Sequence, residues 1–283
     1  MARLVVVTHE FDRFAMWRKK WPPRSSNYLL FDVLVELKKL GHSWRATTGP
    51  NPLHGDLALL HVDSTVVEEK YLALRSSYPR TMNFDTADIS KRSISRLRLA
   101  KGDDWQGPVI VKGNLNSQGS MEGKHNMRAR EAGRPLPHPH LPPAAPYEVF
   151  QRLADVDDDV WGNPHLVVER FLPEIEEDGS YVVRSWIFMG SRERCTKLIA
   201  PGPIVKAGIA IRHAPTEVLE DLRAERERLK FDFGKFDFVI HEGKPILIDA
   251  NRTPGIAHTI LPMMKACARN LAEGLDEILR GGA

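Results

Sequence analysis

The segment KFDFVIHEGKPILIDANRTPG, residues 235–255, limits the possible folds of this chain more than any other part of its 283 residues. Two apolar runs, 236–241 and 245–249, flank a short polar link that contains Gly243. A glycine in a short link between runs rich in β-branched residues is a β-hairpin signal. The chain is therefore expected to contain an antiparallel pair of strands near its C-terminal end.

Three oxygen-bearing side chains lie in this hairpin: Asp237 in the first strand, Asp249 in the second, and Asn251 two residues further on. Residues i and i+2 of a strand point to the same face, so Asp249 and Asn251 share one. A register that turns Asp237 toward them places three ligands of the kind Mg²⁺ prefers side by side. The alternative is a solvated hairpin whose acids lie there by chance.

The runs D-F-V at 237–239 and I-D-A-N-R-T-P-G at 248–255 resemble the metal-binding end of the ATP-grasp superfamily. Enzymes of that superfamily use ATP to activate a carboxylate as an acyl phosphate. The resemblance implies that Asp237, Asp249 and Asn251 bind Mg²⁺, with Mn²⁺ as an alternative. The middle ligand is commonly Glu in the superfamily, and the shorter Asp249 favours one bound metal over two.

Composition is that of an ordinary globular protein, with 42% hydrophobic and 27% charged residues. The net charge of +3 does not by itself argue for nucleic acid. The two cysteines show no zinc or C-x-x-C spacing, which favours a reducing compartment. The apolar run near the N-terminus is too short for a signal peptide or a membrane span. We therefore expect a cytoplasmic protein.

The first 82 residues are predicted to form a small parallel α/β lobe. Buried strands at 4–8 and 57–61 flank a run of leucines and valines at helical spacing that ends near Gly41. No G-x-G-x-x-G follows the first strand. The resemblance implies that this lobe helps to bind the acceptor substrate. The candidate contacts are His9, Arg13 and Arg18, and the alternative is a solvated basic segment.

Two lysines are candidates for binding phosphate. Lys112 ends the apolar strand 109–112, where a buried cation needs an anion, and a glycine-rich loop with free backbone N–H groups follows. Lys91 opens a basic helix after Asn83. The resemblance implies that Lys91 and Lys112 contact the phosphates of ATP and that the loop closes over them. The loop residues concerned are Gly119, Ser120 and Met121.

Residues 124–146, rich in proline and basic side chains, are expected to form an irregular excursion or partly disordered lid, followed by a short helix over 147–154. His138 and His140 lack further ligands in this loop, so a metal is not favoured there. The run HLVVERF at 165–171 predicts a strand. The resemblance implies that its end forms the hinge that reads adenine through the backbone, with Glu174 or Glu176 on the ribose. The hinge residues are Glu169, Arg170, Phe171 and Leu172.

The strand predicted at 181–188 contains Arg184, and a guanidinium inside a β-run generally pairs with a carboxylate or a phosphate. The resemblance implies that Arg184 stabilises the transition state and that Lys235 shares this role. Further strands are expected at 194–199 and 208–212. A helix capped by Thr216 is expected over 216–229, and a helix interrupted near Pro262 ends the chain.

Together these patterns predict an ATP-grasp fold: a small α/β lobe, residues 1–82, then two α+β lobes, 83–172 and 173–283, that clamp ATP. The predicted function is an ADP-forming ligase that joins a small-molecule carboxylate to an amine, with ATP and Mg²⁺ as cofactors. No membrane partner is expected, nucleic acid is not favoured, and a homodimer is left open. The alternatives are a phosphotransferase of the same fold and a non-enzymatic protein that binds anionic partners through basic segments such as 91–98.

Overall fold

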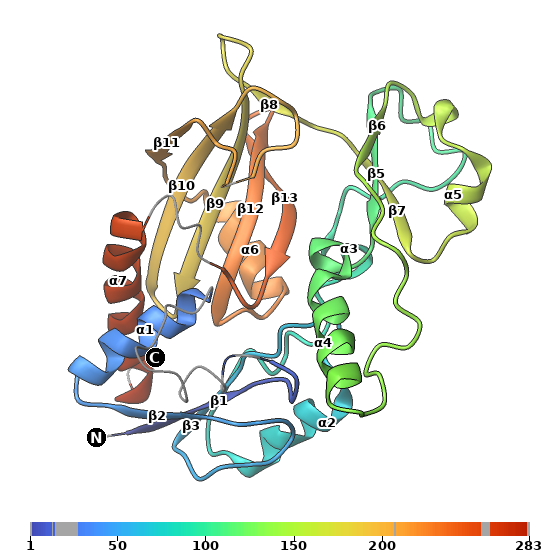
Figure 1. Cartoon of the computed structure of the whole chain (residues 1–283). Helices are drawn as coiled ribbons and strands as arrows, with labels where there is room; N and C mark the ends of the chain where they lie inside the picture. Colours follow the sequence, from blue (N-terminus) through green and yellow to red (C-terminus); the bar gives the residue numbers. More distant parts are fainter. Residues whose placement is uncertain (1, 13, 15–27, 207, 256–260, 282–283) are drawn as a thin grey trace.

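The computed structural model describes residues 2–12, 14, 28–206, 208–255 and 261–281, and they form three sheets (Figure 1). A four-stranded sheet lies in the N-terminal part, a three-stranded sheet in the middle, and a six-stranded sheet in the C-terminal part. Packed helices join the two larger sheets, and a cavity lies between the three-stranded sheet and the six-stranded sheet. No helix among the described residues is long and apolar enough to cross a membrane.

The N-terminal sheet is entirely parallel, in the order β2-β1-β3-β4. Its elements are β1 (Arg3–Val7), α1 (Leu29–Lys39), β2 (Ser43–Ala46), β3 (Leu57–Leu60), α2 (Glu69–Leu72), a 3-10 helix (Ala73–Ser77) and β4 (Thr81–Met82). The parallel α/β lobe predicted from sequence is therefore confirmed. Strand β2 was not predicted, because its sequence SWRA has no apolar run and no fully buried residue.

The middle part contains an antiparallel sheet in the order β6-β5-β7. Its elements are α3 (Lys91–Ile94), β5 (Val109–Gly113), a 3-10 turn (Asn116–Gly119), α4 (Ser120–Glu131), β6 (Glu148–Phe150), a 3-10 helix (Leu153–Asp155), α5 (Asp158–Gly162) and β7 (Leu166–Arg170). Two predictions were wrong here. The expected irregular segment begins as helix α4, and the expected helix over 147–154 is instead strand β6, because Val149 and Phe150 pair with β5.

The C-terminal sheet has the order β11-β10-β9-β12-β13, with β8 paired to β9. Its elements are β8 (Glu174–Ile175), β9 (Tyr181–Met189), β10 (Arg192–Ala200), β11 (Arg212–Pro215), α6 (Glu220–Arg228), β12 (Phe233–His241) and β13 (Lys244–Asn251). The predicted hairpin is β12–β13. Its turn residues Glu242 and Gly243 have φ of 50° and 77°, which is the backbone that a tight two-residue hairpin loop requires.

Three boundaries in this part differ from the predictions. Strand β11 begins at Arg212 instead of ending there. Helix α6 begins at Glu220 after Leu219, and the Thr216 hydroxyl accepts a hydrogen bond from Arg184 instead of capping the helix. The last helix, α7 (Leu261–Leu279), is continuous. Pro262 lies in its first turn, where a missing N–H is tolerated, and so does not interrupt it.

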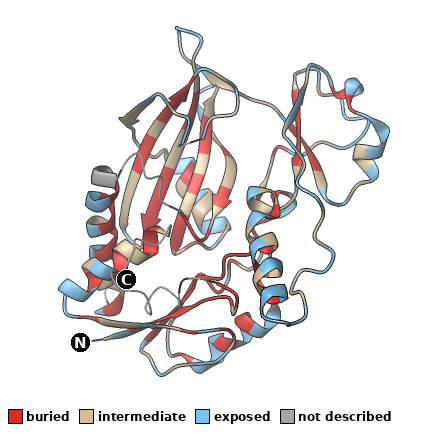
Figure 2. Ribbon diagram, viewed as in Figure 1, coloured by how far each residue is buried: buried red, intermediate tan, exposed pale blue. Residues whose placement is uncertain are grey.

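Helices α1 and α7 join the N-terminal sheet to the six-stranded sheet. Leu4 of β1, Leu34 of α1, Leu271 of α7 and Phe233 of β12 belong to one buried cluster. A second cluster, which includes Trp186 and Leu222, lies under α6 on the opposite face of the six-stranded sheet. Figure 2 shows buried residues along the central strands and more exposure on the three-stranded sheet and α5. The boundaries predicted at residues 82 and 172 stay a prediction.

Candidate functional site

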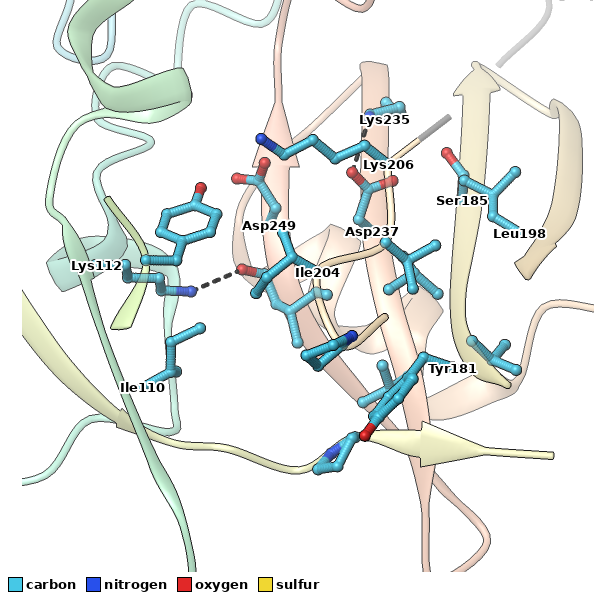
Figure 3. Close-up of a pocket in the computed structure, with 18 of the residues that line it drawn as sticks. Ile110, Lys112, Tyr181, Ser185, Leu198, Ile204, Lys206, Lys235, Asp237 and Asp249 are labelled. Atoms are coloured by element: carbon cyan, nitrogen blue, oxygen red, sulfur yellow. Dashed lines mark hydrogen bonds and ion pairs between the residues drawn. The ribbon is translucent and has the colours of Figure 1, made fainter. Parts of the chain in front are cut away.

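A cavity of about 480 Å³ lies between the three-stranded sheet and the six-stranded sheet (Figure 3). This volume is typical of a small-molecule site. Ile110 and Lys112 of β5 line one side, and alternate residues of β9 and β10 line the other. Figure 3 shows Lys206, Lys235, Asp237 and Asp249 together at one end, with Ile110 and Tyr181 at the other. The cavity therefore has a charged end and a largely apolar end.

Strand register creates the charged end. In the antiparallel sheet Ser185 of β9 lies opposite Thr196 of β10 and Asp237 of β12, and Asp237 lies opposite Asp249 of β13. Since directly opposed residues point to the same face, all four side chains belong to one row across the sheet. The next row holds Arg194, Ile187, Lys235 and Asn251. The sheet thus presents carboxylates and cations in adjacent rows.

Each carboxylate in the cavity is paired with a lysine. The ammonium of Lys91, at the start of α3, forms an ion pair with Asp249. Lys235 Nζ lies 2.8 Å from Asp237 Oδ2. Helix α3 and the β12–β13 hairpin, which are distant in sequence, therefore meet at the Asp237–Asp249 pair.

Lys112 of β5 forms the third pair. Its Nζ lies 2.7 Å from Oε2 of Glu169, a carboxylate on β7 that is only 1% exposed. The same ammonium also donates to the carbonyl of Ile248 at 3.3 Å (Figure 3). Lys112 therefore connects the three-stranded sheet to β13 across the cavity.

The ion pairs favour the charged forms of Asp249, Lys91 and Lys235. Burial by itself would raise the pKa of Asp249, but the charges of Lys91, Lys235 and Lys112 outweigh it and hold the pKa below its ordinary value. Burial would likewise lower the pKa values of Lys91 and Lys235, yet Asp249 raises the first and Asp237 the second above the ordinary lysine range. The charged end therefore carries fixed cations that attract a polyanion.

Asp237 and Asp249 are suited to binding a divalent cation. Oδ1 of Asp237 is buried and has no hydrogen-bond partner among the described residues, although Oδ2 is paired with Lys235. A buried carboxylate oxygen without a donor is a natural ligand for a hard cation such as Mg²⁺. Asn251 fits less directly, because its Oδ1 accepts hydrogen bonds from the backbone N–H and hydroxyl of Thr253.

No family model and no curated protein matches the chain. Solved structures do match its fold. D-alanine–D-alanine ligase from Bacillus anthracis is 14% identical with a TM-score of 0.53, and the match covers 100% of this chain and 97% of that one. Macrocyclase MdnC bound with precursor peptide MdnA, from Microcystis aeruginosa MRC, is 9% identical with a TM-score of 0.51, covering 98% and 99%. The chain has the ATP-grasp fold. At these identities the likeness establishes the fold alone.

The ATP-grasp fold brings most of the predicted site residues to the one cavity. They are Lys91, Lys112, Glu169, Arg170, Phe171, Leu172, Lys235, Asp237 and Asp249. Within the predicted hinge, the backbone N–H groups of Arg170 and Phe171 already donate to the carbonyls of Leu97 and Pro108. Any adenine recognition there would have to use other backbone groups of the hinge.

Arg184, which was predicted to stabilise the transition state, is not among the residues that line the cavity. Arg184 pairs with Glu174, with Nη2 2.6 Å from Oε1, and donates to the Thr216 hydroxyl. Arg184 directly precedes Ser185 in β9, and consecutive residues of a strand point to opposite faces of the sheet. Because Ser185 lines the cavity, Arg184 points to the other face. Glu174 is committed to this pair and Glu176 is paired with Lys197, and neither is among the residues that line the cavity. The ribose assignment has no support from their position.

The predicted phosphate loop also differs. Gly119 is buried with a φ of 72° and precedes α4, so Ser120 and Met121 belong to a helix instead of an open glycine-rich loop. Ser117 and Gln118 reach the cavity instead. Both have positive φ, at 47° and 58°, a strained backbone for non-glycine residues that is often found at functional sites.

The sequence did not identify several polar residues of the cavity, among them Arg194, Lys206 and Tyr147. Arg194 was detectable, because it is a guanidinium inside a predicted strand just as Arg184 is, and its Nε is buried without a hydrogen-bond partner among the described residues. Lys206 and Tyr147 lie in loops from opposite sides of the cavity, and the Lys206 ammonium lies 5.7 Å from the Tyr147 ring centre. No sequence signal in either loop identified them.

A second cavity of about 520 Å³ adjoins the first and shares Ser117 and Gly255 with it. Its wall includes Asp12 and Asp63 from the N-terminal lobe and Glu122 of α4. The Tyr28 hydroxyl donates to Asp63 at 2.7 Å and lies 3.3 Å from Asp12. Burial, together with the charge of Asp63, raises the pKa of Asp12 to about 7. This cavity therefore presents acids to a ligand.

Of the three predicted acceptor contacts only His9 lies among the described residues, and it lines neither cavity. His9 is buried and its ring stacks on that of His125, with ring centres 3.8 Å apart. Arg13 and Arg18 lie outside the described residues.

Proposed function

We propose that the protein is an ATP- and Mg²⁺-dependent ligase that joins a carboxylate to an amine and releases ADP and phosphate. The observation that supports this most is the row of Asp237 and Asp249 flanked by Lys91, Lys112, Lys235 and Arg194 at one end of an otherwise apolar cavity. A triphosphate with an aromatic base has the matching distribution of charge. The ATP-grasp fold is consistent with this use.

In this proposal the base of ATP lies at the apolar end and the phosphates lie at the charged end. The apolar residues that line the cavity include Leu97, Ile110, Val183, Leu198 and Ile248. Asp237 and Asp249 would hold Mg²⁺, which would neutralise phosphate charge when bound. Binding would require the lysines to exchange their present carboxylate partners for phosphate oxygens, an exchange between charge-assisted contacts of the same kind.

The chemistry supplied by bound ATP is transfer of its γ-phosphoryl group to a carboxylate oxygen, after which an amine nitrogen attacks the acyl carbon and phosphate leaves. The chain's own task is positioning and electrostatic stabilisation. Lys235 and Arg194 lie in the row beside the carboxylates, where charge would develop on the transferred group. Lys235 keeps the role assigned to it from the sequence, and Arg194 takes the place of Arg184 beside it.

The second cavity is the proposed site for the amine. Its acids attract a cationic amine, and Asp12, with a pKa raised to about 7, can accept a proton near neutral pH. Because the two cavities share Ser117 and Gly255, a nucleophile there would face the charged end of the first cavity.

The first experiment is thermal unfolding with and without Mg-ATP. Ligand at about one hundred times its dissociation constant adds roughly 2.7 kcal/mol to the free energy of unfolding. We expect a magnesium-dependent rise in the native protein that Asp237→Asn combined with Asp249→Asn removes. The control is Asp178→Asn, an exposed acid on the same lobe, which should behave as the native protein does. A folded native protein with no rise would overturn the proposed nucleotide site.

Product analysis separates the ligase from its alternatives. Screening carboxylate and amine pairs for ADP release, followed by mass spectrometry, should yield an amide-bonded product. A stable phosphorylated product formed without amine would instead identify a phosphotransferase. Absence of ATP binding together with salt-sensitive binding of a nucleic acid would favour the anion-binding alternative.

A further inference from the structure

Three histidines from three separate segments meet outside both cavities. His9 follows β1, His125 lies in the middle of α4, and His138 lies in the loop after α4. One ring nitrogen from each lies within 4.8 Å of those of the other two. His9 and His125 are at most 1% exposed, and His138 is half-buried. The sequence alone showed no such group, because its members are more than ten residues apart.

The ring nitrogens lack hydrogen-bond partners among the described residues. Nε2 of His9, both nitrogens of His125 and Nε2 of His138 are buried and unpartnered. A buried polar atom normally has a protein or water partner, and four such atoms in one place call for an explanation. Neighbouring Glu68 adds a fifth, since its Oε1 is also buried without a hydrogen bond and lies 3.8 Å from His9 Nε2.

We propose that His9, His125 and His138 bind one divalent transition-metal ion of the zinc class, with Glu68 as the fourth ligand. Three imidazoles and a carboxylate are a ligand set that Zn²⁺ accepts in tetrahedral geometry, and imidazole also suits Co²⁺, Ni²⁺ and Cu²⁺. The site is distinct from the Asp237–Asp249 pair, whose oxygen ligands suit Mg²⁺. It does not depend on the proposed ligase activity.

Metal binding requires the rings to move closer and to turn out of their present arrangement, because the His9 and His125 rings are stacked with an interplanar angle of 2°. Ligand atoms about 2.0 to 2.2 Å from a tetrahedral ion lie about 3.4 Å apart, so ring rotations must bring the nitrogens closer than their present spacing. His9 Nδ1 accepts the backbone N–H of Phe11 at 3.1 Å, which places the ring proton on Nε2. Binding through Nε2 moves this proton to Nδ1 and exchanges that local hydrogen bond for a metal bond.

The surroundings hold the three segments in place for such a site. Asn126 of α4 accepts the His138 backbone N–H at 2.9 Å and donates to its carbonyl at 2.7 Å. The Arg128 guanidinium donates to the Phe11 carbonyl at 2.6 Å. Glu122, one turn before His125, accepts the backbone N–H of Thr65 at 2.6 Å. The rings are therefore brought together by contacts that do not themselves involve ring nitrogens.

The bound ion would fasten α4 to the N-terminal lobe. Helix α4 carries Ser120, Met121 and Glu122, which line the second cavity, and Glu68 directly precedes α2 (Figure 1). An ion that links His9 and Glu68 to α4 and the following loop thus fixes one wall of that cavity. Its role is structural, because none of the three histidines lines either cavity.

The test uses the full chain purified without a histidine tag and stripped of metal by chelation. Titration with Zn²⁺ alone should show one tight equivalent and a higher unfolding temperature, and Co²⁺ should give the intense visible absorption of a tetrahedral site. His138→Gln should weaken Zn²⁺ binding by about 100-fold or more, since even an outer-shell partner of a metal site is worth about 10- to 100-fold. The matched control is His140→Gln, an exposed histidine two residues away, which should leave binding unchanged.

His9→Gln and His125→Gln, each checked for folding by circular dichroism, should lose the cobalt spectrum as His138→Gln does. No tight equivalent in the folded native protein would overturn the proposal. The proposal would also fail if His138→Gln bound Zn²⁺ as tightly as the native protein, or if His140→Gln lost the site equally. Loss of Mg-ATP binding with zinc binding intact would overturn only the proposed function.

Discussion

Arg184 and Arg194 lie on the neighbouring strands β9 and β10 but point to opposite faces of the six-stranded sheet. Arg194 lines the first cavity, whereas Arg184 is paired with Glu174 on the other face. Their positions in register explain the difference: Arg194 lies opposite Ile187, and Arg184 lies opposite Lys197. Two similar residues, each in a β-run, thus have different roles.

Replacing each arginine by methionine should separate these roles. Arg194→Met is expected to lower ATP-dependent turnover by about 100- to 1,000-fold, the usual effect of losing one group that stabilises a transition state. Arg184→Met should mainly reduce stability, by about 1 to 3 kcal/mol, because Glu174 loses a charged partner. Steady-state kinetics and urea unfolding of both variants would check this. Equal loss of turnover in the two folded variants would contradict the assignment.

Removing Lys112 should expose how strongly Glu169 depends on it. Lys112→Met leaves a nearly inaccessible carboxylate without its cation, so the free energy of unfolding should fall by about 3 to 5 kcal/mol without ATP. Adding Glu169→Gln should restore much of the stability but not the affinity for ATP. Urea unfolding of the native protein, both single variants and the double variant forms a complete cycle. Additive losses would show that the pair is not coupled.

The second cavity should give the protein a pH-dependent stability through Asp12. Its folded-state pKa is about 7, raised by burial and by Asp63 from the ordinary 3.8. The folded state therefore holds this proton more tightly than the unfolded state does, and stability falls as pH rises from about 4 to about 7. Above that range the loss is complete.

Asp12→Asn should remove the part of the pH dependence of stability that comes from Asp12. The free energy of unfolding of this variant relative to the native protein should therefore increase from about pH 4 to about pH 7 and then stay constant. Urea unfolding across the range measures the difference, which cancels the titration of distant groups. A difference that does not change with pH would show that Asp12 is not the titrating group.

Two helical glycines should respond oppositely to alanine. A Cβ on Gly274 of α7 would lie 2.3 Å from the Met189 carbonyl oxygen, so Gly274→Ala must separate the helix from β9 and should cost about 1 to 3 kcal/mol. A Cβ on Gly123 of α4 would meet only Leu141 at 3.6 Å, an ordinary contact. Gly123→Ala should gain up to about 1 kcal/mol of helix propensity. Chemical denaturation of both variants checks the pair, and destabilisation by Gly123→Ala would contradict it.

Local patterns were sufficient for much of the fold. Strand β1, helix α1 and the β12–β13 hairpin follow from apolar periodicity and from turn residues that lie within a few positions of each other. The turn did not determine the charged pair: its register would place Asp237 opposite Ile248, and a β-bulge between Asp237 and Phe238 brings Asp237 opposite Asp249 instead. The ATP-grasp resemblance added the order of the motifs along the chain.

Two predictions failed because they rested on a short motif that did not by itself determine the local structure. Thr216 has the chemistry of a helix cap, but its hydroxyl is bound by Arg184, and α6 begins four residues later. The loop around Gly119 contains the residues of a phosphate loop, but Ser120 starts a helix. For Thr216 the deciding factor was a hydrogen bond from Arg184, which is distant in sequence. For the Gly119 loop it was helix α4, which extends to Glu131, well beyond the predicted loop.

By itself, the sequence determined elements such as β1, α1 and the β12–β13 hairpin, because strand and helix periods and turn residues are properties of neighbouring residues. Only the tertiary structure decided that Arg194 and not Arg184 lines the cavity. The sheet face to which a strand's side chain points becomes the cavity wall only when other parts of the chain pack against that face. The tertiary structure alone brought His9, His125 and His138 together, since three segments distant in the chain become neighbours only when α4 packs on the N-terminal lobe.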